Sequence, residues 1–309
     1  MATLFDYMTT TQKFLHDQRQ EMINPQDIID YVNRARREVA MRAQCLRILT
    51  PVSGAIISAS VTNPGAHYSS SASISFSAPD FPSGTLPYPN GAQATGTLGI
   101  SGGTISSVVI TFGGSGYFEP IATVTDTAGS GATITPVLSW FNQTSLGQEL
   151  YPFSSVSLST FPGILAILAV KSVSIIYSNY RYSLPCYSFS TYQSMMRQYP
   201  FQYQWAPTVC AQFGQGVNGS FYMYPIPSQP YQMEWDCICL PQDLTTNQSV
   251  EALQLPWTDA VPYFAAHLAF LELQNFNSAK GFLDLFDRQL SIYSAAARPG
   301  RVENPYGRR

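Results

Sequence analysis

Apolar residues recur every three to four positions near the start of the chain and predict two helices. Thr3 can cap a short amphipathic helix that ends near His16. A second helix begins at Asn24 and Pro25, an N-cap followed by proline at the first helical position, and runs to about Arg47. Its apolar stripe has helical spacing and comprises Ile28, Val32, Ala35, Val39 and Leu46.

The same helix carries a row of basic residues: Arg34, Arg36, Arg37, Arg42 and Arg47. We interpret the row as a solvated face, with a specific anion or partner contact as the alternative.

The end of the chain has a similar helical pattern. A helix opens at Thr258 and continues to about Asn275, and either Asn277 or Ser278 caps a last helix that runs to about Ala297. The apolar face of this last helix comprises Phe282, Leu285, Phe286, Gln289, Leu290 and Tyr293. A short polar turn between the two helices implies an antiparallel pair.

Residues 51–149 have a different pattern, with short Val, Ile and Thr runs separated by Gly, Ser, Ala and Pro. The stretch 54–68 matches the stretch 103–117 at a constant offset of 49, and His67 replaces a glycine of the other copy. The identical pairs are Gly54/Gly103, Ile56/Ile105, Ser58/Ser107, Thr62/Thr111, Gly65/Gly114 and Tyr68/Tyr117. Two copies are too few for a solenoid, so they predict a small all-β module whose halves pack together.

A G-x-G-x-x-G pattern occurs at Gly214, Gly216 and Gly219, which can mark a dinucleotide-binding loop. Such a loop must open a helix, but an aromatic-rich strand pattern ending in prolines follows Gly219. Asn218-Gly219 is a strong hairpin signal because both residues tolerate positive φ. We therefore predict a β-hairpin with a structural turn at Asn218 and Gly219, and no nucleotide cofactor.

The remaining patterns complete an α+β prediction. Strands are expected within Leu165–Ser178 and Tyr231–Leu240, and a short helix over Ser188–Tyr199 with Ser190 as a possible cap. We predict a helical bundle formed by both chain ends, with a β-containing middle and an inserted all-β domain. Residues 1–50 and 150–297 form the discontinuous core, residues 51–149 the insertion, and residues 298–309 a flexible basic tail.

Composition favours a subunit that is buried in an assembly. Charged residues make up only 11% of the 309 residues, whereas Tyr (19) and Phe (18) are abundant. No Lys or Arg occurs from Ile48 to Val170. The net charge of −3 gives no overall basic field for nucleic acid.

Five scattered cysteines, an odd number, argue against a secreted disulfide scaffold. We expect buried free thiols, including Cys237 and Cys239, in a chain made in a reducing compartment. No signal peptide is visible, and the longest apolar runs are too short to span a bilayer.

No arrangement of residues indicates an enzyme. The three histidines, His16, His67 and His267, have no metal-ligand spacing, and there is no nucleophile elbow or Walker loop. Glu234 and Asp236 alternate on a predicted strand, but paired carboxylates also bind arginines or backbone amides at interfaces. We therefore expect no catalytic residues, no cofactor and no metal.

Several stretches resemble a known family. Residues 24–40, NPQDIIDYVNRARREVA, resemble the N-terminal helix of head-to-tail adaptor proteins of short-tailed bacteriophages. Residues 255–271, LPWTDAVPYFAAHLAFL, resemble the helix that packs against it, and residues 216–228 resemble the central β part. The Gly-Tyr repeat resembles modules of phage tail proteins. The resemblance covers about residues 1–50 and 160–297.

This resemblance implies a structural virion protein, assembled in the bacterial cytoplasm. Its copies would form a homo-oligomeric ring, a dodecamer, between the portal protein and the tail nozzle protein. Genomic DNA would pass through the channel without sequence-specific binding. The candidate portal-docking residues are Arg298, Arg301, Tyr306, Arg308 and Arg309 of the C-terminal tail.

The inserted module could offer a surface to tail fibres. Two alternatives remain open at this stage. A tail-fibre-like carbohydrate-binding or fibre-attachment protein is favoured by the β repeat. A wall-degrading enzyme would need an acid–base pair that the sequence does not show.

Overall fold

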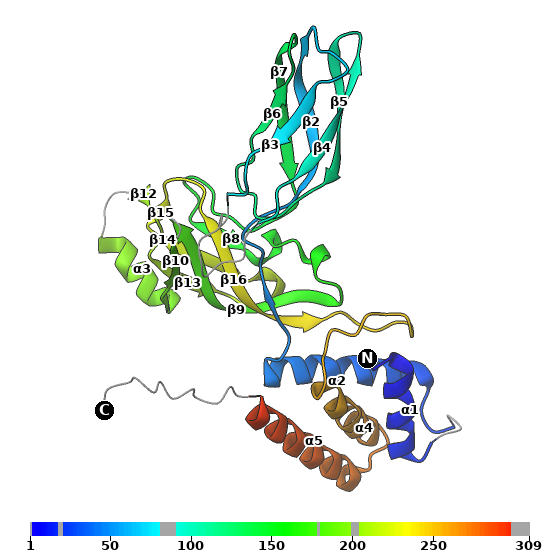
Figure 1. The fold of residues 1–309 in the computed structure, drawn as a ribbon. Helices are drawn as coiled ribbons and strands as arrows, with labels where there is room; N and C mark the ends of the chain where they lie inside the picture. Colours follow the sequence, from blue (N-terminus) through cyan, green and yellow to red (C-terminus); the bar gives the residue numbers. More distant parts are fainter. Residues whose placement is uncertain (1, 18–20, 81–90, 178–179, 199–203, 298–309) are drawn as a thin grey trace, which may run out of the picture.

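The computed structural model describes residues 2–17, 21–80, 91–177, 180–198 and 204–297. Figure 1 shows three parts: a helical bundle built from both chain ends, a layered β region above it, and a slender β module that projects from the β region. The bundle and the β region are called the adaptor core below. The α+β class is confirmed, because helices and strands both contribute substantially and occupy separate layers.

Four helices form the bundle: α1 (Leu4–Leu15), α2 (Pro25–Ala43), α4 (Val261–Glu272) and α5 (Phe276–Ala296). The side chain of Thr3 caps α1, and α1 ends at His16, as the pattern predicted. Helix α2 ends four residues earlier than predicted, because Gln44 takes a left-handed conformation with φ 49°. Residues Arg47–Leu49 then form the short strand β1.

Helix α4 lies at the centre of the bundle. It follows the 3-10 turn η4 (Trp257–Ala260), and its buried residues are mostly small: Val261, Pro262, Ala265, Ala266 and Ala269. Small side chains let neighbouring helices approach closely, and α1, α2 and α5 all contact α4. The cap of α5 is Asn275, whose side chain accepts the backbone N–H of Ser278, instead of Asn277 or Ser278.

Two four-stranded sheets make up the β region. The first is antiparallel and has the order β1–β16–β9–β10, with β16 (Gln232–Pro241), β9 (Ile164–Tyr177) and β10 (Tyr180–Leu184). The second has the order β11–β13–β14–β8, with β11 (Cys186–Tyr187), β13 (Val209–Phe213), β14 (Ser220–Tyr224) and β8 (Leu150–Pro152).

Smaller elements complete the region. They are the strand pair β12 (Gln204–Trp205) and β15 (Ile226–Pro227), the 3-10 turns η1 (Phe153–Ser155) and η2 (Leu158–Thr160), and the helix α3 (Phe189–Gln198). The hydroxyl of Ser188, and not of Ser190, accepts the N–H of Thr191 at the start of α3.

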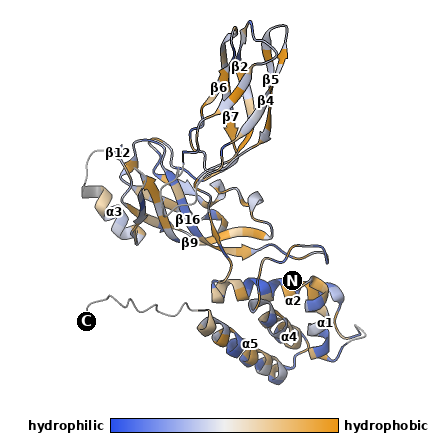
Figure 2. Cartoon of the chain, viewed as in Figure 1, coloured by the Kyte–Doolittle hydropathy of each residue, from blue (hydrophilic) through white to orange (hydrophobic). Residues whose placement is uncertain are grey.

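The two sheets pack face to face around Trp235. Its ring centroid lies 5.5 Å from that of Phe221 and 6.1 Å from that of Phe153, and all three side chains are buried. In Figure 2, β9 and β16 carry hydrophobic residues along much of their length, as expected for strands covered on both faces.

The hairpin predicted near Asn218 forms, but its turn differs from the prediction. Strands β13 and β14 pair antiparallel, with Phe213 opposite Ser220 at the closed end. The connection contains the 3-10 turn η3 (Gly216–Asn218), and Gly219 is extended with φ −66°. Positive φ falls instead on Gly214 and Gly216. Gly219 is required for space, because a Cβ there would lie 2.4 Å from Cε2 of Phe153.

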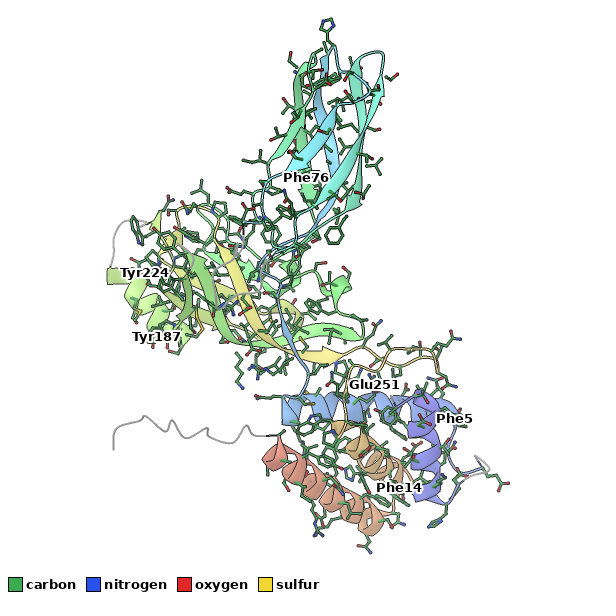
Figure 3. All side chains as sticks on the ribbon, viewed as in Figure 1. Phe5, Phe14, Phe76, Tyr187, Tyr224 and Glu251 are labelled. Carbon is green, nitrogen blue, oxygen red and sulfur yellow. A yellow bond between two sulfur atoms is a disulfide. The ribbon has the colours of Figure 1, made fainter. Side chains whose placement is uncertain are left out.

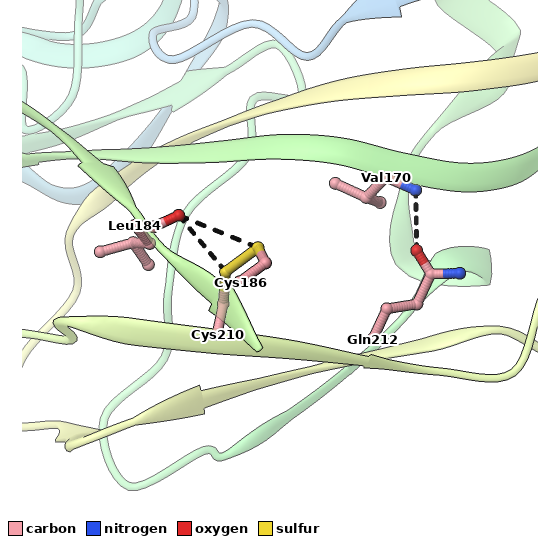
Figure 4. Close-up of a disulfide and its surroundings, with 5 residues drawn as sticks. All are labelled: Val170, Leu184, Cys186, Cys210 and Gln212. Carbon is pink, nitrogen blue, oxygen red and sulfur yellow. Dashed lines mark hydrogen bonds between the residues drawn. A yellow bond between two sulfur atoms is a disulfide. The ribbon is translucent and has the colours of Figure 1, made fainter. Parts of the chain in front are cut away.

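The expectation of free cysteines is wrong for two of the five. Cys186 and Cys210 are opposite each other in the parallel pair β11–β13, 4.5 Å apart at Cα, and form a disulfide (Figure 4). Cys237 and Cys239 are free and buried as expected. Burial raises the pKa of the Cys239 thiol to about 12, so the thiol is neutral at physiological pH.

The projecting module has six strands: β2 (Ile56–Ala66), β3 (Ser73–Phe76), β4 (Thr95–Ser101), β5 (Thr104–Phe112), β6 (Ala122–Thr125) and β7 (Ser130–Leu138). They pair as β2–β7, β3–β6 and β4–β5. The first three strands belong to the first repeat and the last three to the second. Every pair therefore joins one repeat to the other, and the pattern has approximate two-fold symmetry.

The repeated glycines and tyrosines hold the two halves together. The N–H of Gly54 donates to the carbonyl of Tyr117, and the N–H of Tyr68 donates to the carbonyl of Gly103. Each tyrosine hydroxyl also accepts a backbone N–H, from Ala94 at Tyr117 and from Ala132 at Tyr68. His67 takes φ 63° and its counterpart Gly116 takes φ 84°, so the substituted histidine keeps the left-handed conformation of the repeat.

Two acidic residues of the module also accept backbone hydrogen bonds from the other repeat. The carboxylate of Asp80 accepts the N–H of Phe118, which follows Tyr117. The carboxylate of Asp126 accepts the N–H of Ser69, which follows Tyr68. Each acid thus stabilises the backbone of the other repeat, a role that the sequence pattern did not indicate.

The module leaves and re-enters the core at one place. The N–H of Asn142 donates to the carbonyl of Pro51, so the two connections lie side by side. Asn142 and Thr144 then hydrogen-bond to the segment that leads into β16. Residues 142–149, which we assigned to the insertion, therefore contact the core.

Candidate assembly interface

A buried ion pair joins the helical bundle to the segment after β16. Two guanidinium nitrogens of Arg36 donate to the two carboxylate oxygens of Glu251, at 2.9 and 2.8 Å. Both side chains are almost fully buried. Figure 3 shows Glu251 where the bundle meets the β region. Arg36 is therefore a structural cation inside the protein, so the interpretation of the arginine row as a solvated face is wrong for Arg36, whereas Arg34, Arg42 and Arg47 are exposed.

The two charged side chains make further hydrogen bonds to the backbone, and Asn33 bonds to the same segment. Arg36 donates to the carbonyl of Gln242 at 2.7 Å, and Glu251 accepts the N–H of Leu253 at 2.8 Å. Asn33 both donates to the carbonyl of Leu244 and accepts its N–H. A buried hydrogen-bonded network of this kind favours one arrangement of the elements that it joins. Here the network favours one orientation of the helical bundle relative to the β region.

The carboxylates of β16 have structural partners. Glu234 pairs with Arg181 at 3.1 Å, and Asp236 pairs with Arg47. Each pair links β16 to the outer strand on one side of the first sheet. This geometry supports the arginine-contact interpretation of the two acids over general acid–base chemistry.

An apolar groove with a volume of about 250 Å³ opens on the face of the β9–β10 hairpin. Its lining includes Tyr177 and Tyr182 of the hairpin and the segment Trp205, Ala206 and Pro207. Trp205 is 55% exposed and Tyr182 is 47% exposed. Exposed tryptophan and tyrosine beside a pocket are typical of the residues that dominate protein–protein binding.

The predicted site residues divide into two groups. All five candidate portal-docking residues, Arg298, Arg301, Tyr306, Arg308 and Arg309, lie outside the described residues. The tail begins directly after α5, which ends at Ala296. Asn218 and Gly219 lie in the β13–β14 connection, where Gly219 lies against the ring of Phe153.

In the part of the chain that the structure describes, no group of three or more His, Cys, Asp or Glu side chains could hold a metal ion. His267 contacts the carbonyl of Ala279 through Nδ1 at 2.8 Å, which joins α4 to α5. Among the described residues, no helix is long and apolar enough to cross a membrane.

The sequence analysis missed the groove, the disulfide and the buried ion pair. The groove had a weak signal in the Tyr180-Arg181-Tyr182 alternation, which places two exposed tyrosines on one face of a strand. The ion pair also had a signal, because Arg36 lies four residues after Val32, beside the apolar stripe, whereas the exposed Arg34 lies on the opposite face of the helix.

Residues 142–305 match the family model described as SU10 adaptor protein. The match covers more than half of the chain and begins where the chain returns from the module to the core. The protein belongs to the SU10 adaptor family, and is thus a structural bacteriophage adaptor. Membership implies contacts with phage portal and tail components and a place in the virion. No curated protein matches the chain significantly.

Proposed function

We propose that this protein is the head-to-tail adaptor of a short-tailed phage. In this proposal it forms a ring, of twelve copies, between the portal and the tail nozzle, and it extends the DNA channel. The observation that carries the proposal is the family match over the whole second half of the core. The α2–α4 packing, which unites the two stretches that resemble adaptor helices, supports it.

The fold suits a rigid spacer in a stack of rings. Its long axis runs from the bundle through the β region to the module (Figure 1), and the Arg36–Glu251 network ties the first two together. A ring of such subunits would hold the portal and the tail nozzle at a fixed distance, a role that needs no catalytic step. DNA would pass as a polyanion, without base-specific contacts.

Electron microscopy of the purified protein mixed with its portal tests the proposal. An adaptor should cap the portal as a coaxial ring with the symmetry of the bound copies. A protein that leaves portals bare but binds host glycans would instead support the tail-fibre-like carbohydrate-binding alternative, which the β module favours.

The C-terminal tail is the proposed portal anchor. Its four arginines can form charge-assisted bonds to carboxylates, Tyr306 can fill a pocket, and ring symmetry multiplies a weak contact. Truncation after Ala297 should leave the circular dichroism spectrum unchanged but weaken portal binding, more strongly at raised salt. A truncated chain that binds portals as tightly as the full chain would move the docking surface to the helices.

The module is the proposed attachment surface for tail fibres. It projects away from the bundle, so a partner could reach it without contacting the portal side. Particles assembled with a chain that lacks the module should lose their fibres. Normal fibre content in those particles would contradict this role.

A further inference from the structure

Four exposed apolar side chains surround the end of the module that is nearer to the core. They are Ile57 (61% exposed), Phe112 (55%), Ile121 (67%) and Val137 (42%), and they are called the collar below. Strand register places them there: Val137 is opposite Ser58, next to the entry at Gly54, and Phe112 is opposite Thr95. Ile121 directly precedes β6, whose first residue pairs with Phe76, and Phe76 lies in the lower half of the module (Figure 3).

The opposite end of the module is polar. There Ala66 pairs with Ser130, Ser101 pairs with Thr104, and His67 is exposed. Four of the five exposed large apolar side chains among the described residues of the module are thus at one end, where a neighbouring protein could cover them. The fifth, Val109, lies between the ends, opposite Thr97.

The internal repeat shows that the fold does not need the collar. At the offset of 49, Phe112 corresponds to Asn63, Ile121 to Ala72, and Ile57 to Ser106. Each half folds with a polar or small residue where the other half exposes a large apolar one. Residues that hold the halves together, such as the tyrosines, are instead the same in both. The collar therefore serves a purpose other than the stability of the module.

The collar and the groove of the β9–β10 hairpin are complementary in character. The nine residues that line the groove are all uncharged, as are the four of the collar. Apolar, charge-free surfaces of this kind lose little on desolvation when they meet. The groove also has the concave form and the aromatic lining that would receive projecting side chains such as Phe112 and Ile121.

The two surfaces belong to different parts of the chain, the groove to the β region and the collar to the base of the module. Two different patches on one subunit that bind each other generate a head-to-tail interface, and such an interface gives a ring when the rotation between successive copies closes. A second copy of this chain is therefore the occupant that satisfies both surfaces.

We propose that the groove of one copy receives the collar of the next copy, so that the module contributes directly to ring closure. This inference rests on the proposed ring and names the surfaces that form it. The module then has two roles along its length: its base joins neighbours, and its polar end remains free.

Native mass spectrometry of the full chain, alone and with portal rings, tests the pairing. Trp205→Glu places a charge in the groove and Phe112→Glu places one in the collar. Each should reduce the population of complete rings at least tenfold, with an unchanged circular dichroism spectrum. Tyr187→Glu, at an exposed tyrosine away from the groove, and Thr133→Glu, at the polar end of the module, are matched controls that should assemble normally.

Mixing the two variants gives the sharper result. A Trp205→Glu chain has an intact collar, and a Phe112→Glu chain has an intact groove, so these two surfaces can still bind each other. The surfaces left free in the resulting pair are both mutated, so no third copy can add. An equimolar mixture should give pairs of 34.0 kDa chains, free or on portals, where either variant alone gives single copies. Single copies only, or complete rings, in the mixture would overturn the pairing.

The outcomes separate the two levels of the proposal. If the wild-type chain never forms rings, with or without portals, the adaptor function proposed above fails. If the wild-type chain forms rings and both single variants do so equally well, only the groove–collar contact is wrong.

Discussion

The module and the adaptor core are held together by residues at very different distances along the chain. In the module, the packed residues occupy equivalent positions of two neighbouring repeats. In the adaptor core, contacts such as the Arg36–Glu251 ion pair join residues that are 215 positions apart. In the module, Ile56 packs with Tyr117 in one cluster, and Ile105 packs with Tyr68 in a second, symmetric one. In the core, a single cluster draws on helices and strands from both ends of the chain.

This difference has a consequence for folding. Every strand pair of the module lies within residues 56–138, so its folding does not require the chain ends. The core cannot fold until both ends have met, because α4 packs against α1 and α2. Damage to one region should therefore leave the other intact, and the following predictions test this.

The largest effect is expected from Glu251→Ala in the core. It leaves the guanidinium of Arg36 buried without its carboxylate, which should cost about 3–5 kcal/mol of unfolding free energy. Urea denaturation followed by helical circular dichroism measures this, and hydrogen exchange should show β2–β7 still protected. Asp243→Ala, which removes the half-exposed partner of Arg37, is the control and should cost less than about 1 kcal/mol.

Gly219→Asn separates two explanations of that glycine. If Gly219 were needed for positive φ, asparagine would be tolerated. Because its φ is −66° and the ring of Phe153 occupies the space, Asn should instead destabilise the core by about 1–3 kcal/mol, as should Ala and Val. Thermal unfolding of the three variants tests this. An Asn variant as stable as the wild type would support the original prediction that Gly219 is needed for a turn with positive φ.

Two tyrosine substitutions test the symmetry of the module. The hydroxyl of Tyr117 accepts the N–H of Ala94 and donates to the carbonyl of Ser77, so Tyr117→Phe should cost about 1–3 kcal/mol. Tyr68→Phe removes one such bond, to Ala132, and should cost about 1 kcal/mol. Hydrogen exchange of the β2–β7 amides measures both. A loss of protection in the bundle would show that the regions share one folding unit.

A smaller effect should appear as pH dependence in the module. The hydroxyl of Ser69, followed by the N–H groups of Ser69 and Gly129, lowers the pKa of Asp126 below its ordinary value of 3.8. The ionised form is therefore stabilised by folding, and this contribution is complete above about pH 4 and lost as pH falls toward the lowered pKa. Asp126→Asn should weaken amide protection in the module at pH 7, and the difference from wild type should shrink on acidification. Glu119→Gln is the control, and an equal effect from it would indicate a general charge effect.

The smallest effect on the core is expected from removing the module itself. Deletion of about Val52 to Trp140 with a short linker should keep the helical spectrum, because Pro51 and Asn142 are already joined by a 2.8 Å hydrogen bond. The melting temperature of the bundle should change little. Loss of helical circular dichroism would show that the module and the core depend on each other.

Local signals predicted much of the fold. The caps at Thr3 and Asn24, the proline at the start of α2 and the strand character around the hairpin all act within a few residues, so the sequence expresses them directly. The repeat at an offset of 49 is also local in this sense, since each half encodes the same strands. The tail residues from Arg298 onward stay a prediction.

Tertiary contacts decided the rest, because the deciding partner is remote in sequence. Arg36 is buried because Glu251 reaches it, and Gly219 is a glycine because Phe153 is packed against it. Cys186 and Cys210 pair because two short strands lie side by side. The sequence alone determined which segments become helices and strands and that the middle of the chain repeats itself. Only the tertiary structure decided which charges are buried and which apolar residues remain exposed, since burial depends on what the rest of the chain leaves uncovered.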